Sequence, residues 1–481
     1  MSNRLPPSGT SRTGSLGSPQ QFYKGVQKTF SSIDPATGEK LEDYPEWDTT
    51  RLDKALDLSQ AAFRRWGSLQ VGERCQYLAK VDQALRSRRD EFALLMSREM
   101  GKTLAEGRAE VEKCAAACKY YADEAPRMLA DQVIATDARK SLVAFQPLGT
   151  VLAVMPWNFP FWQVIRAAAP ALAAGNVMVL KHAHSVSGCA LALEEVFRDA
   201  GFPEGVFQTL MVDIETVDKL IRDERIQAVT LTGSEKAGVE VGKAAGESLK
   251  KCVLELGGSD AFVVLEDADM PLAARQGCTS RYQNAGQSCI AAKRFIVVAK
   301  AADRFLEAFK AEVSKLKMGD PLAEGTTLGP LARLDLRDKL HEQVQDALEH
   351  GAKALLGCEN PGGKGAFYPA SILDGVRPGM RAWTEELFGP VASVIRVKDE
   401  AEALEVANVT SFGLGGSVWT QDRERGEAFA RRMQCGSAFV NRMVKSDQRL
   451  PFGGVKRSGH GRELSVHGIH EFVNIKTISL D

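Results

Sequence analysis

The stretch that decides the fold is residues 151–180, VLAVMPWNFPFWQVIRAAAPALAAGNVMVL. It begins with an apolar run at 151–155, continues as a helical pattern over 161–174, and returns to an apolar run at 177–180. Runs of four or five aliphatic residues that alternate with helices are typical of buried parallel strands. The stretch therefore predicts a strand, a helix and a second strand, which is the repeating unit of a doubly wound α/β sheet.

The same alternation extends along most of the chain. Before this stretch, apolar residues at three- and four-residue spacing over 49–129 predict helices. After it, the pattern predicts helices at 186–200, 214–222 and from Glu235, with strands at 206–210 and 228–231. Beyond Gly258 a second series begins, with strands expected at 261–265, 294–298, 391–395 and 415–419 and a helix at 301–316. Two parallel-sheet domains are the predicted architecture.

Size and composition exclude several classes of protein. A chain of 481 residues is too long for one ordinary domain, and 44% hydrophobic residues suffice for large cores. The 61 Lys and Arg nearly balance the 62 Asp and Glu, so no overall charge attracts nucleic acid or an anionic membrane. No apolar run approaches the roughly 18 residues that a membrane-spanning helix needs. Nine scattered cysteines indicate reduced thiols and a cytoplasmic protein, and no metal-ligand pattern is present.

The two ends of the chain suggest roles outside the sheets. Residues 1–33 lack Asp and Glu and are rich in Ser, Gly, Pro and Arg. We expect a disordered tail over 1–29, while import into an organelle, directed by 1–33, stays open as the alternative. Near the other end, Val473, Ile475 and Thr477 alternate with polar residues and predict an exposed edge strand. Such an edge favours pairing with another subunit.

Two short segments carry the residue types of a covalent catalyst. Residues 282–289 read YQNAGQSC, and residues 255–258 read ELGG after a strand-like run. Cys289 needs thiolate character to attack a carbonyl, and a free thiol titrates at about 8.5. The run after Cys289 is predicted to begin a helix, whose N-terminus would favour the anion. Glu255 at a strand end is placed to deprotonate water. Taken alone, a buried structural cysteine and a salt-bridged carboxylate are the alternatives.

Together with PWNFP at 156–160, TGSEKAG at 232–238, EELFGP at 385–390 and PFGGVK at 451–456, these segments resemble the aldehyde dehydrogenase superfamily over roughly residues 30–481. The resemblance implies that Cys289 attacks an aldehyde and that Glu255 activates the water that hydrolyses the thioester. It also implies that Asn158 and the Cys289 backbone N–H stabilise the oxyanion. An asparagine that only closes the turn is the alternative for Asn158.

The resemblance also implies a dinucleotide site, although no G-x-G-x-x-G fingerprint is present. Gly233 and Ser234, at the start of a helix, would hold the pyrophosphate. Lys181 would reach the adenosine ribose, and Glu386 the nicotinamide ribose. The remaining residues assigned to the cofactor are Trp157, His184, Leu256, Gly257 and Phe388. His184 stands where many NAD-linked members carry a glutamate that would repel a 2′-phosphate, so we expect NADP as well as NAD, and no metal.

Among subfamilies, Arg166, Lys445-Ser446-Asp447 and Lys293-Arg294-Phe295 are similar to bacterial succinate-semialdehyde dehydrogenases. In that group Arg166 and Ser446 would hold the substrate carboxylate. Gln283 stands where one branch has a second arginine. The alternatives are a broad-specificity dehydrogenase of uncharged aldehydes, an enzyme that passes the acyl group to coenzyme A, and a catalytically silent protein of the same fold.

The resemblance implies a division of the chain and an assembly. Residues 30–137 and 148–255 would bind NAD(P), and residues 256–446 would form the catalytic domain. Residues 138–147 and 465–481 would be strands of a small β flap that joins subunits into a homodimer or homotetramer. The small-molecule aldehyde is the expected partner, with no nucleic acid and no membrane.

Overall fold

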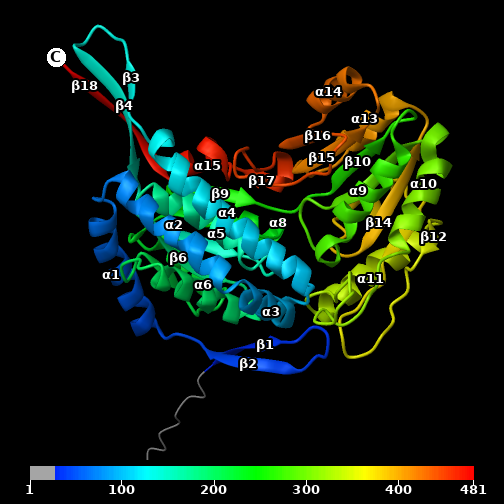
Figure 1. The fold of residues 1–481 in the computed structure, drawn as a ribbon, viewed down its shortest axis with the longest axis horizontal. Helices are drawn as coiled ribbons and strands as arrows, with labels where there is room; N and C mark the ends of the chain where they lie inside the picture. Colours follow the sequence, from blue (N-terminus) through cyan, green and yellow to red (C-terminus); the bar gives the residue numbers. More distant parts are fainter. Residues whose placement is uncertain (1–27) are drawn as a thin grey trace, which may run out of the picture.

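The computed structural model describes residues 28–481, which form two large, mainly parallel sheets with helices on both faces (Figure 1). The tail expected over 1–29 and the presequence considered for 1–33 fall mainly outside the described residues, although Thr29 already belongs to a strand. No helix within 28–481 is long and apolar enough to cross a membrane. The domain boundaries given above remain predictions.

The first sheet has six strands. In spatial order they are β17 (Gly459–His460), β9 (Lys251–Glu255), β8 (Ile226–Thr232), β5 (Thr150–Met155), β6 (Val177–His182) and β7 (Phe207–Thr209). All pair in parallel except β17, which joins β9 antiparallel. The predicted alternation from 151 to 231 is therefore confirmed.

Helices cover both faces of this sheet. They are α1 (Thr49–Trp66), α2 (Val71–Ser87), α3 (Arg89–Met100), α4 (Leu104–Met128), α5 (Trp162–Ala173), α6 (Ser187–Asp199), α7 (Thr216–Arg222) and α8 (Glu235–Glu247). Leu152 and Val179 face a core made with α1, α7 and α8, whereas Val151 and Met178 face the core made with α2–α6. Burial on both faces explains why these strands are unbroken apolar runs.

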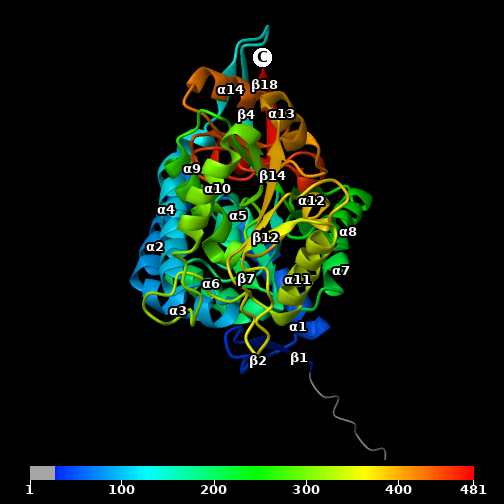
Figure 2. The ribbon, with the colours of Figure 1, turned by 90° about the vertical axis from the view of Figure 1, so that its right-hand side faces the viewer.

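The second sheet has seven strands. In spatial order they are β12 (Lys353–Leu356), β13 (Ser371–Asp374), β14 (Val391–Val397), β11 (Ala292–Val298), β10 (Asp260–Val264), β15 (Gly415–Trp419) and β16 (Ser437–Val440). Its helices are α9 (Met270–Tyr282), α10 (Ala299–Val313), α11 (Leu334–Glu349), α12 (Arg381–Thr384), α13 (Glu400–Asn408) and α14 (Arg423–Arg432). Figure 2 shows α9 and α10 on one side of β14 and α11 on the other. Both sheets are thus doubly wound, as predicted.

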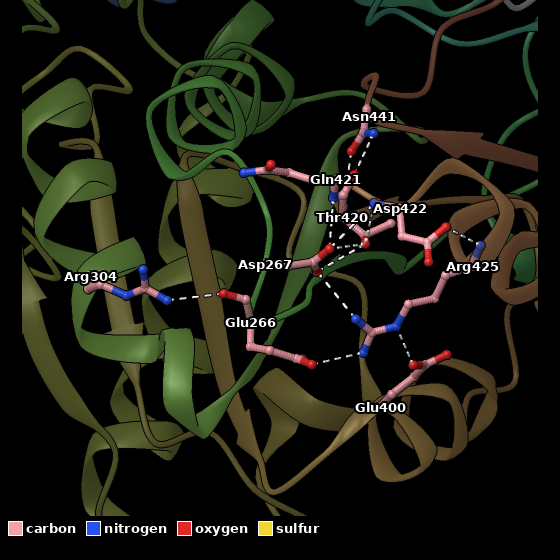
Figure 3. Close-up of polar contacts among 9 residues, drawn as sticks. All are labelled: Glu266, Asp267, Arg304, Glu400, Thr420, Gln421, Asp422, Arg425 and Asn441. Atoms are coloured by element: carbon pink, nitrogen blue, oxygen red, sulfur yellow. Dashed lines mark hydrogen bonds and ion pairs between the residues drawn. The ribbon is translucent and has the colours of Figure 1, made fainter.

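A cluster of charges closes one edge of the second sheet (Figure 3). Arg425 of α14 forms ion pairs with Glu266, Asp267 and Glu400. Asp267, just after β10, also accepts hydrogen bonds from the Thr420 hydroxyl after β15. The cluster therefore joins the carboxyl ends of two neighbouring strands to the start of two helices. Cys289, predicted to be catalytic, lies at the opposite side of the sheet, near the amino ends of its strands.

A third sheet projects from the body of the molecule as an arm (Figure 1). Its order is β18 (Val473–Leu480), β4 (Lys140–Pro147) and β3 (Gln132–Ile134), with α15 (Ser465–Glu471) leading into β18. The remaining strands, β1 (Thr29–Ile33) and β2 (Lys40–Pro45), form a separate antiparallel hairpin. Within the described chain β18 pairs on one side only, so the predicted edge strand is present.

The arm leads to a prediction about assembly. Val133, Ile475 and Leu480 on the arm are 71%, 59% and 49% exposed, which is costly for a sheet in water. Truncation after Val473 removes the rest of β18 but spares buried Phe472 and Val473. We expect the truncated protein to sediment as a smaller assembly, whereas Leu249→Lys, a change at a residue 95% exposed outside the arm, should sediment like the wild type. An unchanged mass after truncation would contradict a role of the arm in assembly.

Candidate active site

The predicted catalytic residues gather where the carboxyl edge of the six-stranded sheet meets the amino edge of the seven-stranded sheet. Asn158 follows β5, and Glu255 is the last residue of β9. Cys289 lies just before β11, in the loop that enters the second sheet. The Asn158 side-chain amide donates to the Gln287 carbonyl at 3.0 Å, which joins the two edges directly. Sheet edges of this kind are where α/β proteins build ligand sites.

Beside this junction lies a cavity of about 190 Å³. Its walls come from α4, α5, the Cys289 loop and the segment 443–452, and they include Lys113, Phe159, Trp162, Arg166, Gln283, Cys289, Lys445, Ser446 and Phe452. Neither Asn158 nor Glu255 is part of its lining. The structure thus brings Cys289, Arg166 and Ser446 to one cavity and leaves Asn158 and Glu255 beside it.

The loop that carries Cys289 has a strained backbone. Asn284 and Ala285 have φ angles of 54° and 51°, in the left-handed region that costs non-glycine residues of order 1–3 kcal/mol each. Gly286 has φ 74°, and a Cβ there would lie 2.3 Å from the Gly389 carbonyl oxygen. The Glu106 carboxylate accepts from the Asn284 backbone N–H at 2.6 Å and helps to hold this conformation. The strain stays in place because neighbouring elements fix the loop.

The expected helix after Cys289 is wrong. Residues 289–290 form a turn and Ala292 already begins β11, so no helix N-terminus faces the sulfur. The short apolar run 290–292 fitted either element, and pairing with β10 decided for the strand. Burial instead raises the pKa of Cys289 to about 11, against the opposing positive charges of Arg166 and Lys293. The resting group is therefore a protonated thiol at neutral pH.

Asn158 has one amide hydrogen to spare. Its nitrogen makes one hydrogen bond, to Gln287, and an amide nitrogen has two hydrogens to donate. The Asn284 side-chain amide donates a hydrogen bond to the backbone carbonyl oxygen of Asn158 at 2.8 Å. This bond fixes the turn from the other side. The side chain is 4% exposed and is directed at the Cys289 loop. It can serve as an oxyanion donor there.

Glu255 is a buried carboxyl group without a hydrogen-bond partner among the described residues. Burial and the nearby Glu463 carboxylate raise its pKa well above the usual range, against the charges of Arg166 and Arg462. A Cβ on Gly453 would lie 2.7 Å from one Glu255 oxygen, so the carboxyl group packs against that glycine. A buried carboxyl group with a raised pKa is suited to general acid–base chemistry.

Arg166, expected to bind the substrate, already has a carboxylate partner. It is 2% exposed and forms an ion pair with Glu463. It also donates to the Thr232 hydroxyl at 3.2 Å, and its guanidinium lies 4.5 Å from the centre of the Phe452 ring. Arg166 therefore lines the cavity with its charge largely compensated.

Ser446 leads to a cavity residue that the sequence analysis missed. Its hydroxyl accepts from the Lys113 ammonium at 2.6 Å, and Lys113 also lies 4.1 Å from the centre of the Trp162 ring. Glu106, Glu110 and Lys113 all line the cavity from α4. Their spacing places three charged residues on one face of a helix that is otherwise apolar on that side, a pattern visible in the sequence.

One group of predicted cofactor residues lies close to the Cys289 loop. The Trp157 and Phe388 rings meet edge to face, with centroids 5.8 Å apart. Glu386 accepts from the Gly258 backbone N–H at 3.2 Å and forms an ion pair with Lys293 at 3.0 Å. A Cβ on Gly257 would lie 2.5 Å from a Glu386 oxygen. Lys293 in turn donates to the Cys289 carbonyl at 2.7 Å, so this group is connected to the nucleophile.

The second group lies along the ends of β6 and β8. The Ser234 hydroxyl accepts from the Ala237 N–H and caps α8, with Gly233 just before it. Leu256 is buried beside α8. Burial lowers the pKa of Lys181 to about 8, and this ammonium has no hydrogen bond or ion pair with residues 28–481. The His184 ring stacks on Phe30 with centroids 3.6 Å apart and donates from Nε2 to the Val212 carbonyl.

Comparisons with known proteins agree with this geometry. Residues 22–478 match the family model described as the aldehyde dehydrogenase family. The chain is 48% identical to a succinate semialdehyde dehydrogenase [NAD(P)+] of Escherichia coli, over 94% of this chain and 97% of that protein. It is 48% identical to a probable succinate-semialdehyde dehydrogenase [NADP(+)] of Synechocystis, over 93% of this chain and 99% of that protein.

A solved structure gives the same result in three dimensions. The succinic semialdehyde dehydrogenase of Streptococcus pyogenes, in complex with NADP+, superposes with a TM-score of 0.92 and 38% sequence identity. The match covers 94% of this chain and 99% of that one. The chain belongs to the aldehyde dehydrogenase family.

Proposed function

We propose that this chain oxidises succinate semialdehyde to succinate, with NADP or NAD as the electron acceptor. The observation that carries the proposal is the cavity beside Cys289, which contains buried positive charge and a serine hydroxyl. A substrate carboxylate would be stranded in an apolar pocket without such groups. The names of the relatives given above support the same substrate.

In the first half of the reaction, the Cys289 sulfur attacks the aldehyde carbon and forms a thiohemiacetal. The oxygen of that carbon gains negative charge, which the free N–H of Asn158 and the backbone N–H of Cys289 stabilise. Lys293 and Arg166 oppose the rise in the thiol pKa caused by burial and so favour the attacking anion. Loss of a hydride from that carbon, which the oxidised cofactor would accept when bound, re-forms the carbonyl group and leaves a thioester on Cys289.

In the second half, Glu255 removes a proton from water, and the water oxygen attacks the thioester carbon. The carbon–sulfur bond breaks, the acid leaves, and Cys289 is restored. A carboxyl group with a raised pKa is a stronger base than an ordinary surface glutamate once it is ionised. Glu255 must turn away from Gly453 to reach the cavity. The presence of this base favours hydrolysis over transfer of the acyl group to coenzyme A.

The residues present fit a dinucleotide with a 2′-phosphate. Lys181 is a buried ammonium without a partner in the described chain, and the N-terminus of α8 has the polarity that binds phosphate. His184 adds no negative charge between them. Lys181 and His184 would lie at the adenosine ribose, Gly233 and Ser234 at the pyrophosphate, and Trp157, Glu386 and Phe388 at the nicotinamide half. Leu256 and Gly257 would lie near the nicotinamide ring.

A dehydrogenase of uncharged aldehydes is the second candidate. Phe159, Trp162 and Phe452 line the cavity, and Glu463 compensates Arg166, so an apolar aldehyde also finds suitable contacts. The two candidates differ in whether the positive charges that line the cavity bind a carboxylate of the substrate.

Steady-state kcat/KM for succinate semialdehyde and butanal, each with NADP and with NAD, separates them. We expect succinate semialdehyde to exceed butanal by about tenfold or more, since a charge-assisted hydrogen bond contributes about 1.5–3 kcal/mol. Equal kcat/KM for the two aldehydes would favour the second candidate.

The cofactor assignment predicts the effect of a charge at position 184. His184→Glu places a carboxylate near the expected 2′-phosphate, and the repulsion should shift the NADP/NAD ratio of kcat/KM towards NAD by about tenfold or more. His184→Gln is the matched control, because glutamine has the size of glutamate and no charge. A ratio that shifts equally in both variants would show that the His184 ring, and not its charge, matters.

A further inference from the structure

We propose that Lys113, together with Ser446, binds the carboxylate of the substrate, beside Arg166, whose charge is already engaged by Glu463. The inference rests on the proposed function, because it names the partner of a carboxylate that only a substrate such as succinate semialdehyde carries. It adds Lys113 to the resemblance, which assigns that contact to Arg166 and Ser446.

Lys113 is a half-buried cation without an anionic partner within residues 28–481. It lies on α4 with its ammonium in the cavity that Cys289 also lines. Its contacts are the Ser446 hydroxyl and the face of the Trp162 ring, and it forms no ion pair with any carboxylate of residues 28–481. Burial lowers the pKa of Lys113 to about 8, and the charge of Arg166 lowers it further in the same direction. An anion that enters the cavity would relieve both effects.

The nearby carboxylates are already engaged. Glu110 pairs with Lys102 and accepts from the backbone N–H groups of Phe161 and Trp162 at 2.9 Å each. Glu106 accepts from the backbone N–H of Asn284. Their contacts are with the start of α5 and with the Cys289 loop, so these two residues support the walls of the cavity. Neither forms an ion pair with Lys113, although the charge of Glu110 favours the protonated ammonium.

The other cations near the cavity are poorer candidates. Arg166 has Glu463, and Lys293 has Glu386. Lys445 lines the cavity but is exposed, so its ammonium keeps its hydration. Among the described residues that line the cavity, Lys113 is therefore the cation that is shielded from water and has no ion-pair partner.

Lys113 and Ser446 can hold both oxygens of a carboxylate. The Ser446 oxygen accepts from Lys113, which leaves its own O–H free to donate to one carboxylate oxygen. The ammonium has further hydrogens for the other oxygen. Because Cys289 lines the same cavity of about 190 Å³, a short chain between the carboxylate and the aldehyde fits the site. The aldehyde end would then lie at the sulfur.

The test compares Lys113→Met with Lys119→Met. Lys119 lies on the same helix but is exposed, where it pairs with Asp123. For Lys113→Met we expect the ratio of kcat/KM for succinate semialdehyde to that for butanal to fall about 10- to 150-fold, mainly through KM for succinate semialdehyde. Lys119→Met should keep the wild-type ratio. Inhibition by succinate should weaken in parallel in Lys113→Met, as measured with the wild type and both variants.

Three outcomes separate this inference from the proposed function. A wild-type enzyme that does not prefer succinate semialdehyde over butanal overturns the proposed function itself. A wild type with that preference and a Lys113→Met enzyme that retains it overturn the role of Lys113 alone, as does an equal loss for both aldehydes. If Lys113→Met does not fold, Lys113→Gln keeps a hydrogen-bond donor to Ser446 without the charge, and the same ratio decides.

Discussion

The hydrogen bond between the Asn158 amide and the Gln287 carbonyl is the constraint on which the rest of the site depends. It joins the carboxyl edge of one sheet to the loop that enters the other. The strained backbone at Asn284 and Ala285 lies within that loop, and it would relax if the two sheets were apart. The site therefore forms where the edges of the two sheets are held together. The position of Cys289 is a consequence of this contact.

Buried charge is the second organising feature, and part of it forms ion pairs. Lys102 pairs with Glu110, Arg166 with Glu463 and Lys293 with Glu386. No ion-pair partner within residues 28–481 is present for Glu255, for Lys181 or for the half-buried Lys113. Under the proposed function, Glu255 would be the base for water, Lys113 a cation for the substrate and Lys181 a cation for the cofactor. An unpaired buried charge costs stability, which is acceptable only where a ligand compensates it.

Much of this fold could be predicted from the sequence because strands buried on both faces must be apolar throughout. The runs at 151–155 and 177–180 show this clearly. The run at 290–292 was too short to decide between helix and strand, and its outcome depended on pairing with β10. The catalytic set followed from local motifs. The compensation of Arg166 by Glu463 did not, because the two residues are far apart in sequence and meet only in the folded chain.

The most direct test of the central claim is to trap the covalent intermediate. Glu255→Gln lacks the base that activates water, so succinate semialdehyde and NADP should convert Cys289 to a thioester that persists. Mass spectrometry after an acid quench should find the mass of one succinyl group on the peptide that contains Cys289, and no addition in a Glu255→Gln, Cys289→Ala double variant. Rapid turnover by Glu255→Gln with unmodified Cys289 would contradict the roles assigned to both residues.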